Sequence, residues 1–132
     1  GGAALLVDYG AEPPAHGGGD TLQALKNHEP VDPLSAPGLC DLTAHVDFTA
    51  LASGLRASGA RTAPLLTQGT FLSRLGIAAR AEALARAHPD RAETFAAQHH
   101  RLTAPDQMGT LFKVLAATGP GQPVPPAFEG AS

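Results

Sequence analysis

Hydrophobic residues occur along the chain in short continuous runs separated by helical stripes. Two runs span 3–7 and 111–117, and a third spans 62–67 with Pro64 inside it. Continuous rather than alternating hydrophobicity is typical of a strand buried on both faces, as in a parallel sheet. The runs therefore predict three strands, and Pro64 predicts that the middle one lies at an edge or starts at the proline.

A helical stripe follows the residue best suited to cap a helix. Asp47 is a good N-cap, and Gly59 ends the stripe behind it. The apolar positions recur at the spacing that places them on one helix face, at Phe48, Leu51, Ala52 and Leu55. The pattern predicts one amphipathic helix between the first two strands.

Further helices are predicted between the second and third strands. Thr70 can cap a turn of helix over 71–75, and 77–87 is an alanine-rich helical stretch. Pro89 suits the first position of a new helix, which continues over 91–102. The order of strand, long loop, helix, strand, helices and strand predicts an α/β fold. Three strands are few for a central parallel strand, so we expect half of a larger sheet.

The segment 11–39 is rich in proline, glycine and acidic residues and is predicted to be a long loop. Pro13-Pro14 and Gly17-Gly18-Gly19 exclude regular structure, and Asp20 can cap a short helix that runs through Leu25. We expect this loop to be more mobile than the strands. The tail 119–132 holds four prolines and is predicted to be extended. The division is 1–118 as the domain part and 119–132 as the tail.

Composition narrows the classes of function. The 132 residues fit one domain or a piece of one, and the net charge of -3 offers no basic field for nucleic acid or an anionic membrane. No run approaches the roughly 20 apolar residues that span a bilayer. The single cysteine, Cys40, cannot form an internal disulfide, which favours a reducing compartment. A start without Met inside an apolar run suggests a cut from a longer polypeptide.

The first candidate site follows the first strand, at Asp8-Tyr9-Gly10. In open α/β sheets, ligands bind outside the carboxyl ends of the strands. The Asp8 carboxylate could accept two parallel hydrogen bonds from a guanidinium. The structural alternative is a turn in which Asp8 bonds local amides and Gly10 takes a positive φ.

Other candidates have equally plain alternatives. His45 could take a proton from a substrate nitrogen, because imidazole exchanges protons near neutral pH, or it could be a hydrogen-bonded structural residue. Gln68 and Gly69 could line the same cleft or could serve as ordinary turn residues. His99 and His100 point about 100° apart on a helix and are interpreted as solvated rather than metal-binding, since 3.6 residues make a turn. No zinc spacing is present, so no metal is expected.

Several islands of sequence together resemble the MidA-like methyltransferases, a group that includes a mitochondrial complex I assembly factor. The strongest is Asp41-Leu42-Thr43-Ala44-His45-Val46-Asp47-Phe48. The others, in the same order and spacing, are 2–10, 20–24, 37–38, 67–69 with 71–72 and 75–77, 80–81, and 108–109 with 111–114.

The resemblance implies the C-terminal half of a Rossmann-like class I methyltransferase sheet that ends in an antiparallel strand. It implies S-adenosylmethionine as cofactor and a protein substrate, with arginine as the methylated side chain. On this basis Asp8, Tyr9 and His45 are expected to be catalytic. The expected substrate-binding residues are Asp41, Thr43, Asp47, Gln68 and Gly69. The expected location is the bacterial cytoplasm, or the mitochondrial matrix for a eukaryotic member.

The family's glycine-rich cofactor loop and its Asn-Glu-Phe-type motif do not occur in this sequence. The cofactor is therefore expected to be bound mainly by a missing N-terminal half. The alternative is a non-catalytic fragment or interaction module that binds no cofactor.

The sharpest sequence prediction is geometric: Asp8, Tyr9, His45 and Gln68 converge at one rim of the sheet. The strand that ends before Gln68 should run parallel to the first strand, with the helix after Asp47 as the crossover. Right-handed crossovers bring both strand ends to the same edge.

Overall fold

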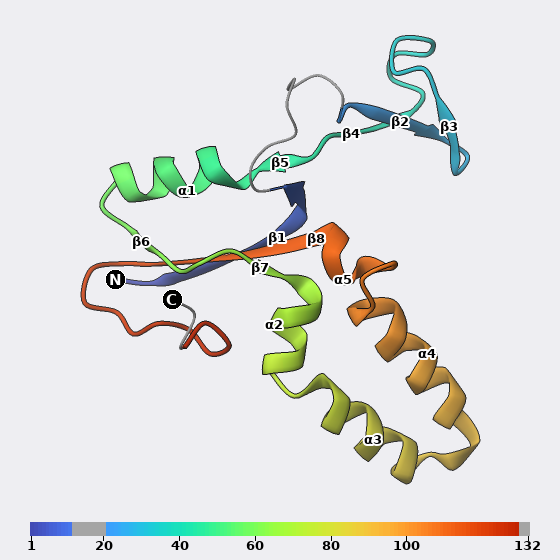
Figure 1. Ribbon diagram of the computed structural model, residues 1–132. Helices are drawn as coiled ribbons and strands as arrows, with labels where there is room; N and C mark the ends of the chain where they lie inside the picture. The colour runs from blue at the N-terminus through green and yellow to red at the C-terminus, as the bar shows by residue number, and fades with distance from the viewer. Residues whose placement is uncertain (12–20, 130–132) are drawn as a thin grey trace.

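The computed structural model describes residues 1–11 and 21–129. A curled sheet lies at the centre, a small three-stranded arm extends from one side, and a helical hairpin extends from the other (Figure 1). The predicted α/β class is confirmed, with strands and helices in nearly the expected order. No helix of the described ranges is both long and apolar enough to cross a membrane.

Two long strands form the middle of the main sheet. β1 (Ala3–Ala11) and β8 (Phe112–Thr118) pair antiparallel from Ala3↔Thr118 to Tyr9↔Phe112. The predicted antiparallel last strand is therefore confirmed, although it begins one residue later than expected because Leu111 ends a helix.

Three short strands complete the main sheet. β6 (Arg61–Thr62) and β7 (Leu66–Thr67) pair with the far edge of β8 and run in the same direction as β1. The predicted 62–67 strand is thus two pieces separated around Pro64, which has no amide hydrogen for the ladder. β5 (Val46–Asp47), which the sequence did not predict as a strand, pairs parallel with the end of β1.

Helix α1 (Phe48–Ala57) covers one face of the sheet. The N-cap prediction is confirmed, since the Ala50 N–H donates to Asp47 Oδ1 at 2.9 Å. Phe48, Ala52 and Leu115 are buried between helix and sheet. The helical stripe predicted from the sequence is therefore the stripe that forms this half of the core.

The opposite face is covered by α2 (Gln68–Arg74) and by the tail. Phe128 is 2% exposed and packs with Leu66, Val114 and Ala116. Arg74 Nη1 also donates to the Ala127 carbonyl at 2.9 Å, which ties the tail to α2. The Thr70 cap is wrong: Thr67 is the N-cap, and its Oγ1 accepts from the Thr70 N–H at 3.3 Å, so the helix starts three residues earlier.

The helical hairpin consists of α3 (Ile77–Ala87), the 3-10 turn η1 (Pro89–Arg91) and α4 (Ala92–Thr103), followed by α5 (Met108–Leu111). Pro89 occupies the first position of η1, as predicted. No residue of α3 or α4 is buried. The hairpin therefore stands away from the sheet in Figure 1.

The long-loop prediction for 11–39 is wrong over much of its described part. Strands β2 (Gln23–Lys26) and β3 (Glu29–Val31) form a hairpin, and β4 (Asp41–Thr43) pairs with β2. Asn27 and His28 both have positive φ, at 54° and 66°, the backbone of a two-residue hairpin turn. The helix expected through Leu25 is a strand instead. Asp20, Pro13-Pro14 and Gly17-Gly18-Gly19 lie outside the described residues, as does most of the segment expected to be mobile.

The first strand is less buried than its sequence predicted. Leu5 and Val7 are 51% and 48% exposed. Both point to the face that carries Val114 and Ala116, their cross-strand partners. The strand has the hydrophobicity of a buried strand, but the described residues do not supply enough neighbours to bury it.

Candidate functional site

The candidate site lies where β1 meets β5. Gly10 pairs with Val46, so His45 enters the sheet beside the end of β1 that holds Asp8 and Tyr9. The structure thus brings these three sequence-predicted residues to the same end of β1. Asp8 and His45 are exposed, whereas Tyr9 is half-buried.

Asp8 adopts the local hydrogen bond that the structural alternative proposed. The Tyr9 N–H donates to Asp8 Oδ1 at 2.8 Å. Gly10, by contrast, does not take a positive φ and lies within β1. Its lack of a side chain is needed for another reason, because a β-carbon there would meet the Phe48 ring at 2.5 Å.

The Tyr9 ring stacks on Phe112, with ring centroids 4.5 Å apart and planes tilted by 42°. Such a tilted pair holds an aromatic ring in place with roughly 0.5–1.5 kcal/mol beyond its buried area. The phenol is thus positioned by the neighbouring strand, next to Asp8.

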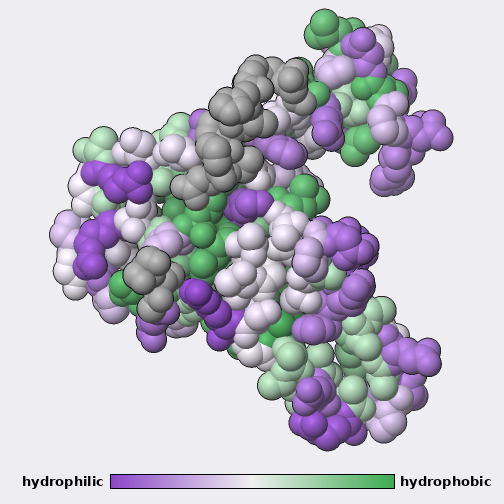
Figure 2. All heavy atoms as spheres, viewed as in Figure 1, coloured by the Kyte–Doolittle hydropathy of each residue, from purple (hydrophilic) through white to green (hydrophobic). Residues whose placement is uncertain are grey.

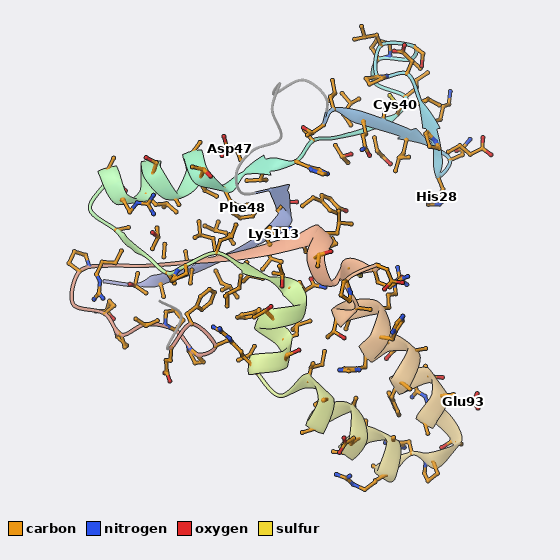
Figure 3. All side chains as sticks on the ribbon, in the orientation of Figure 1. His28, Cys40, Asp47, Phe48, Glu93 and Lys113 are labelled. Carbon is orange, nitrogen blue, oxygen red and sulfur yellow. The ribbon has the colours of Figure 1, made fainter. Side chains whose placement is uncertain are left out.

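Lys113 is a site neighbour that the sequence prediction missed. It lies directly opposite Asp8 in the β1–β8 ladder and opposite Thr67 in the β7–β8 ladder, so the three residues form one row across the sheet. Its Nζ donates to the Thr110 carbonyl. Figure 3 shows Lys113 near Phe48 and the start of α1. A lysine inside the apolar run 111–117 was the available signal.

Gln68 follows the same row but its side chain is engaged elsewhere. It is buried, and its Nε2 donates to the Leu102 carbonyl at 2.9 Å. Gly69 packs against the Thr103 carbonyl, where a β-carbon would come within 2.6 Å. Both residues join α2 to the end of α4 and do not point into the rim with Asp8.

The remaining predicted residues lead into the rim along β4. Asp41 pairs with Leu25 and is exposed, and Thr43 pairs with Gln23 and is half-buried. Asp47 is occupied as the cap of α1. The structure therefore places Asp41 and Thr43 on the arm, two to four positions before His45, rather than at the end of β1.

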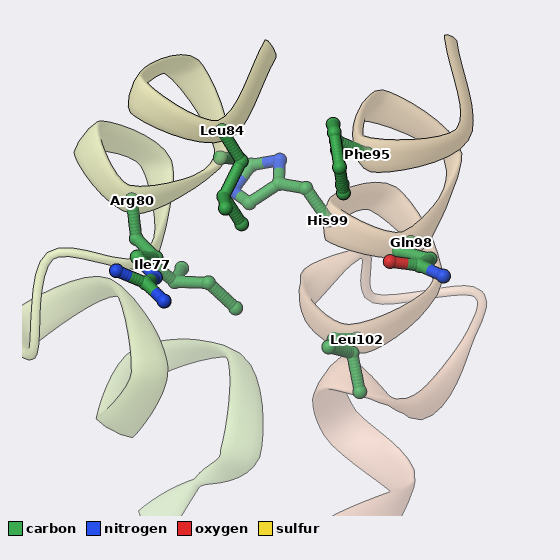
Figure 4. A pocket seen from close by; sticks show the side chains of 8 residues that line it. Ile77, Arg80, Leu84, Phe95, Gln98, His99 and Leu102 are labelled. Carbon is green, nitrogen blue, oxygen red and sulfur yellow. The ribbon is translucent and has the colours of Figure 1, made fainter. Parts of the chain in front are cut away.

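A second hollow lies between α3 and α4. It has a volume of about 130 Å³, and its labelled lining residues in Figure 4 include Arg80, Leu84, Phe95 and His99. His99 is half-buried there, so only His100 fits the prediction that both histidines are solvated. Within the described ranges no three His, Cys, Asp or Glu side chains gather as a metal site.

The rim beside β5 can perform two kinds of chemistry. A carboxylate next to an aromatic ring suits a planar cation, and an exposed imidazole can accept a proton. The described residues contain no glycine-rich turn that joins a strand to a helix, which a nucleotide-containing cofactor commonly uses. This part of the chain therefore offers a substrate rim rather than a cofactor cradle.

Comparison with solved structures identifies the class of fold. An uncharacterised Burkholderia thailandensis protein aligns over 98% of this chain and 36% of its own, with 29% identity and a TM-score of 0.86. A chain described as a "likely methyl transferase", also from Burkholderia thailandensis and bound to S-adenosyl-homocysteine, aligns over 98% of this chain and 35% of its own. Its identity is 29% and its TM-score 0.84. The chain is therefore part of a Rossmann-like methyltransferase fold.

Sequence comparison identifies the family. Residues 1–65 match the family described as "Putative S-adenosyl-L-methionine-dependent methyltransferase". The chain is 42% identical over 120 residues to the Drosophila melanogaster protein arginine methyltransferase NDUFAF7 homolog, mitochondrial, and 36% identical over 120 residues to the human protein arginine methyltransferase NDUFAF7, mitochondrial. In each case the match covers 88% of this chain and 26% of the relative. The chain belongs to the MidA-like family of S-adenosylmethionine-dependent methyltransferases, and it spans about a quarter of the length of these relatives.

Proposed function

We propose that the full-length protein carrying this chain transfers a methyl group from S-adenosylmethionine to a nitrogen of a protein arginine side chain. The observation that carries the proposal is the pairing of β1 with β5, which gathers Asp8, Tyr9 and His45 at one strand end. The names of the eukaryotic relatives support arginine as the target. Those names also support a mitochondrial location for a eukaryotic member and leave the bacterial cytoplasm as the proposal for a bacterial one.

Each rim residue has a distinct task in this proposal. Asp8 binds the guanidinium with the acceptor positions that the Tyr9 amide leaves free. The Tyr9 ring, fixed by Phe112, limits how the substrate side chain can approach. His45 accepts the proton that the nitrogen loses as it bonds to the methyl carbon, and the sulfonium leaves as the neutral thioether. When bound, S-adenosylmethionine supplies the electrophilic methyl group.

Asp8→Asn in the full-length protein tests the proposal. Incorporation of labelled methyl groups into protein is measured, and the product is hydrolysed to identify the methylated amino acid. We expect labelled methylarginine with the unsubstituted protein and a loss of about 10²-fold or more with Asp8→Asn, because an amide lacks the charge that binds guanidinium. Asp90→Asn is the matched control, since Asp90 lies in η1, far along the chain in the helical hairpin.

Three outcomes would count against the proposal. Labelled methyl groups on lysine or histidine would reject arginine as the substrate. Full activity of Asp8→Asn would reject the role of this rim. Absence of methyl transfer by the full-length protein, with protein binding retained, would favour the non-catalytic interaction module.

A further inference from the structure

One edge of β1 is free along most of its length. β8 pairs with Ala3–Tyr9 on one side, whereas on the other side β5 pairs only with Gly10 and Ala11. Among the described residues, no strand lies beside Ala3–Tyr9 on that second side. An unpaired row of backbone donors and acceptors of this length is a template for another strand.

The side chains along this edge are apolar and accessible. Leu5 and Val7 are each about half exposed. Beside them is a hollow of about 320 Å³, lined by Leu5, Phe71, Leu75, Pro125 and Pro126 among others. A free strand edge and an apolar hollow therefore adjoin each other at the start of β1.

This edge has none of the features that protect natural edge strands. Such strands are usually short, or carry a charge, a proline or a bulge. Ala3–Val7 contains no charged residue and no proline, and its register with β8 continues without a bulge to Tyr9. The edge therefore has the properties of a contact surface that another element covers.

The orientation of the covering strand follows from the sequence of β1. Its apolar residues point to both faces, since Leu6 packs with the α1 cluster while Leu5 and Val7 point to the other face. Strands of this kind belong to parallel sheets that helices cover on both sides. β5, the one strand on this edge, is already parallel.

The geometry points to an interaction surface, made of the free edge at Ala3–Tyr9 and the hollow beside Leu5, that binds an apolar β-strand parallel to β1. The strand comes from the polypeptide that family members have beyond the matched region, which is about three quarters of the Drosophila relative and two thirds of the first Burkholderia chain. It lies end to end with β5, so its carboxyl end meets Asp8, Tyr9 and His45. This inference stands on the sheet geometry and does not depend on the methylated substrate.

Two substitutions in the full-length polypeptide that carries these residues test the surface. Leu5→Asp is expected to lower the melting temperature by about 10 °C or more, because the carboxylate would be buried against the covering strand. Leu34→Asp is the matched control, since Leu34 is 83% exposed on the arm, and a shift within about 2 °C is expected there. Equal, small shifts for both variants would overturn the inference.

Hydrogen exchange gives an independent measurement on the unsubstituted full-length protein. An edge strand protects only alternate amides, whereas a strand paired on both sides protects all of them. We expect slow exchange at every amide of Ala3–Tyr9. Rapid exchange at alternate amides would overturn the inference. Protection that disappears on dilution, in step with dissociation measured by light scattering, would instead assign the edge to a second copy and would equally overturn it.

Discussion

The ring of Phe48 lies directly over the backbone of Gly10, so that a β-carbon at position 10 would come within 2.5 Å of two ring carbons. This contact fixes the start of α1 against the end of β1. The helix cannot move away without exposing Phe48, and the strand end cannot carry a side chain. The position of His45, three residues before Phe48, therefore depends on a glycine in the neighbouring strand.

Gly10→Ala is expected to destabilise the protein by about 1–3 kcal/mol, because the added methyl group must displace a buried ring. Denaturant unfolding measures the change. Gly2→Ala is the control, since nothing lies within 4 Å of a β-carbon at Gly2. A neutral Gly10→Ala variant would show that Phe48 does not pack as described.

Asp47→Ala is expected to cost about 1 kcal/mol through loss of the helix cap, whereas Asp47→Asn should change little because asparagine caps equally well. Thermal unfolding of both variants measures this. If the asparagine variant keeps its stability but the full-length protein loses binding of its substrate, Asp47 has a role in recognition beyond the cap.

Leu115→Ala is expected to cost about 2–5 kcal/mol, because Leu115 is almost fully buried and its removal leaves a cavity. Leu5→Ala in the 132-residue chain should cost only about 1 kcal/mol, since half of the side chain is already in water. From the sequence alone, Leu5 would be assigned the larger cost. Equal losses of stability for the two variants would indicate that Leu5 is covered even in this chain.

The 132-residue chain is expected to bind S-adenosylmethionine weakly or not at all. The described residues provide a rim but no glycine-rich turn leading into a helix, so the carboxylate and ribose of the cofactor lack their usual backbone donors. Titration calorimetry measures the affinity. Low-micromolar binding would mean that this chain contains a cofactor cradle of another kind.

The sequence predicted the parts of the fold that depend on local pattern. Asp47 and the stripe behind it have the spacing of a capped helix, and 111–117 has the hydrophobicity of an inner strand. The arm was missed because an Asn27-His28 turn lacks the glycine that marks most two-residue hairpins. The Thr70 cap was placed wrongly because two threonines three positions apart both suit an N-cap.

The candidate site could be predicted only in part. The ends of strands and the link from β4 to α1 indicated where Asp8, Tyr9 and His45 would lie, although no measurement yet tests their roles. The side-chain direction of Gln68 depends on the position of α4, which packs 34 residues further along the chain. Lys113 was missed because cross-strand register, not sequence spacing, places it opposite Asp8.

The folded-back tail has a consequence for synthesis of the chain. The cluster under α1 is complete once β8 has emerged from the ribosome, since Leu115 is its last buried member. The cluster on the opposite face also needs Phe128, which is translated thirteen residues later (128 minus 115). The two halves of the core therefore mature in sequence during translation, and the side of the sheet that carries α2 is the last to close.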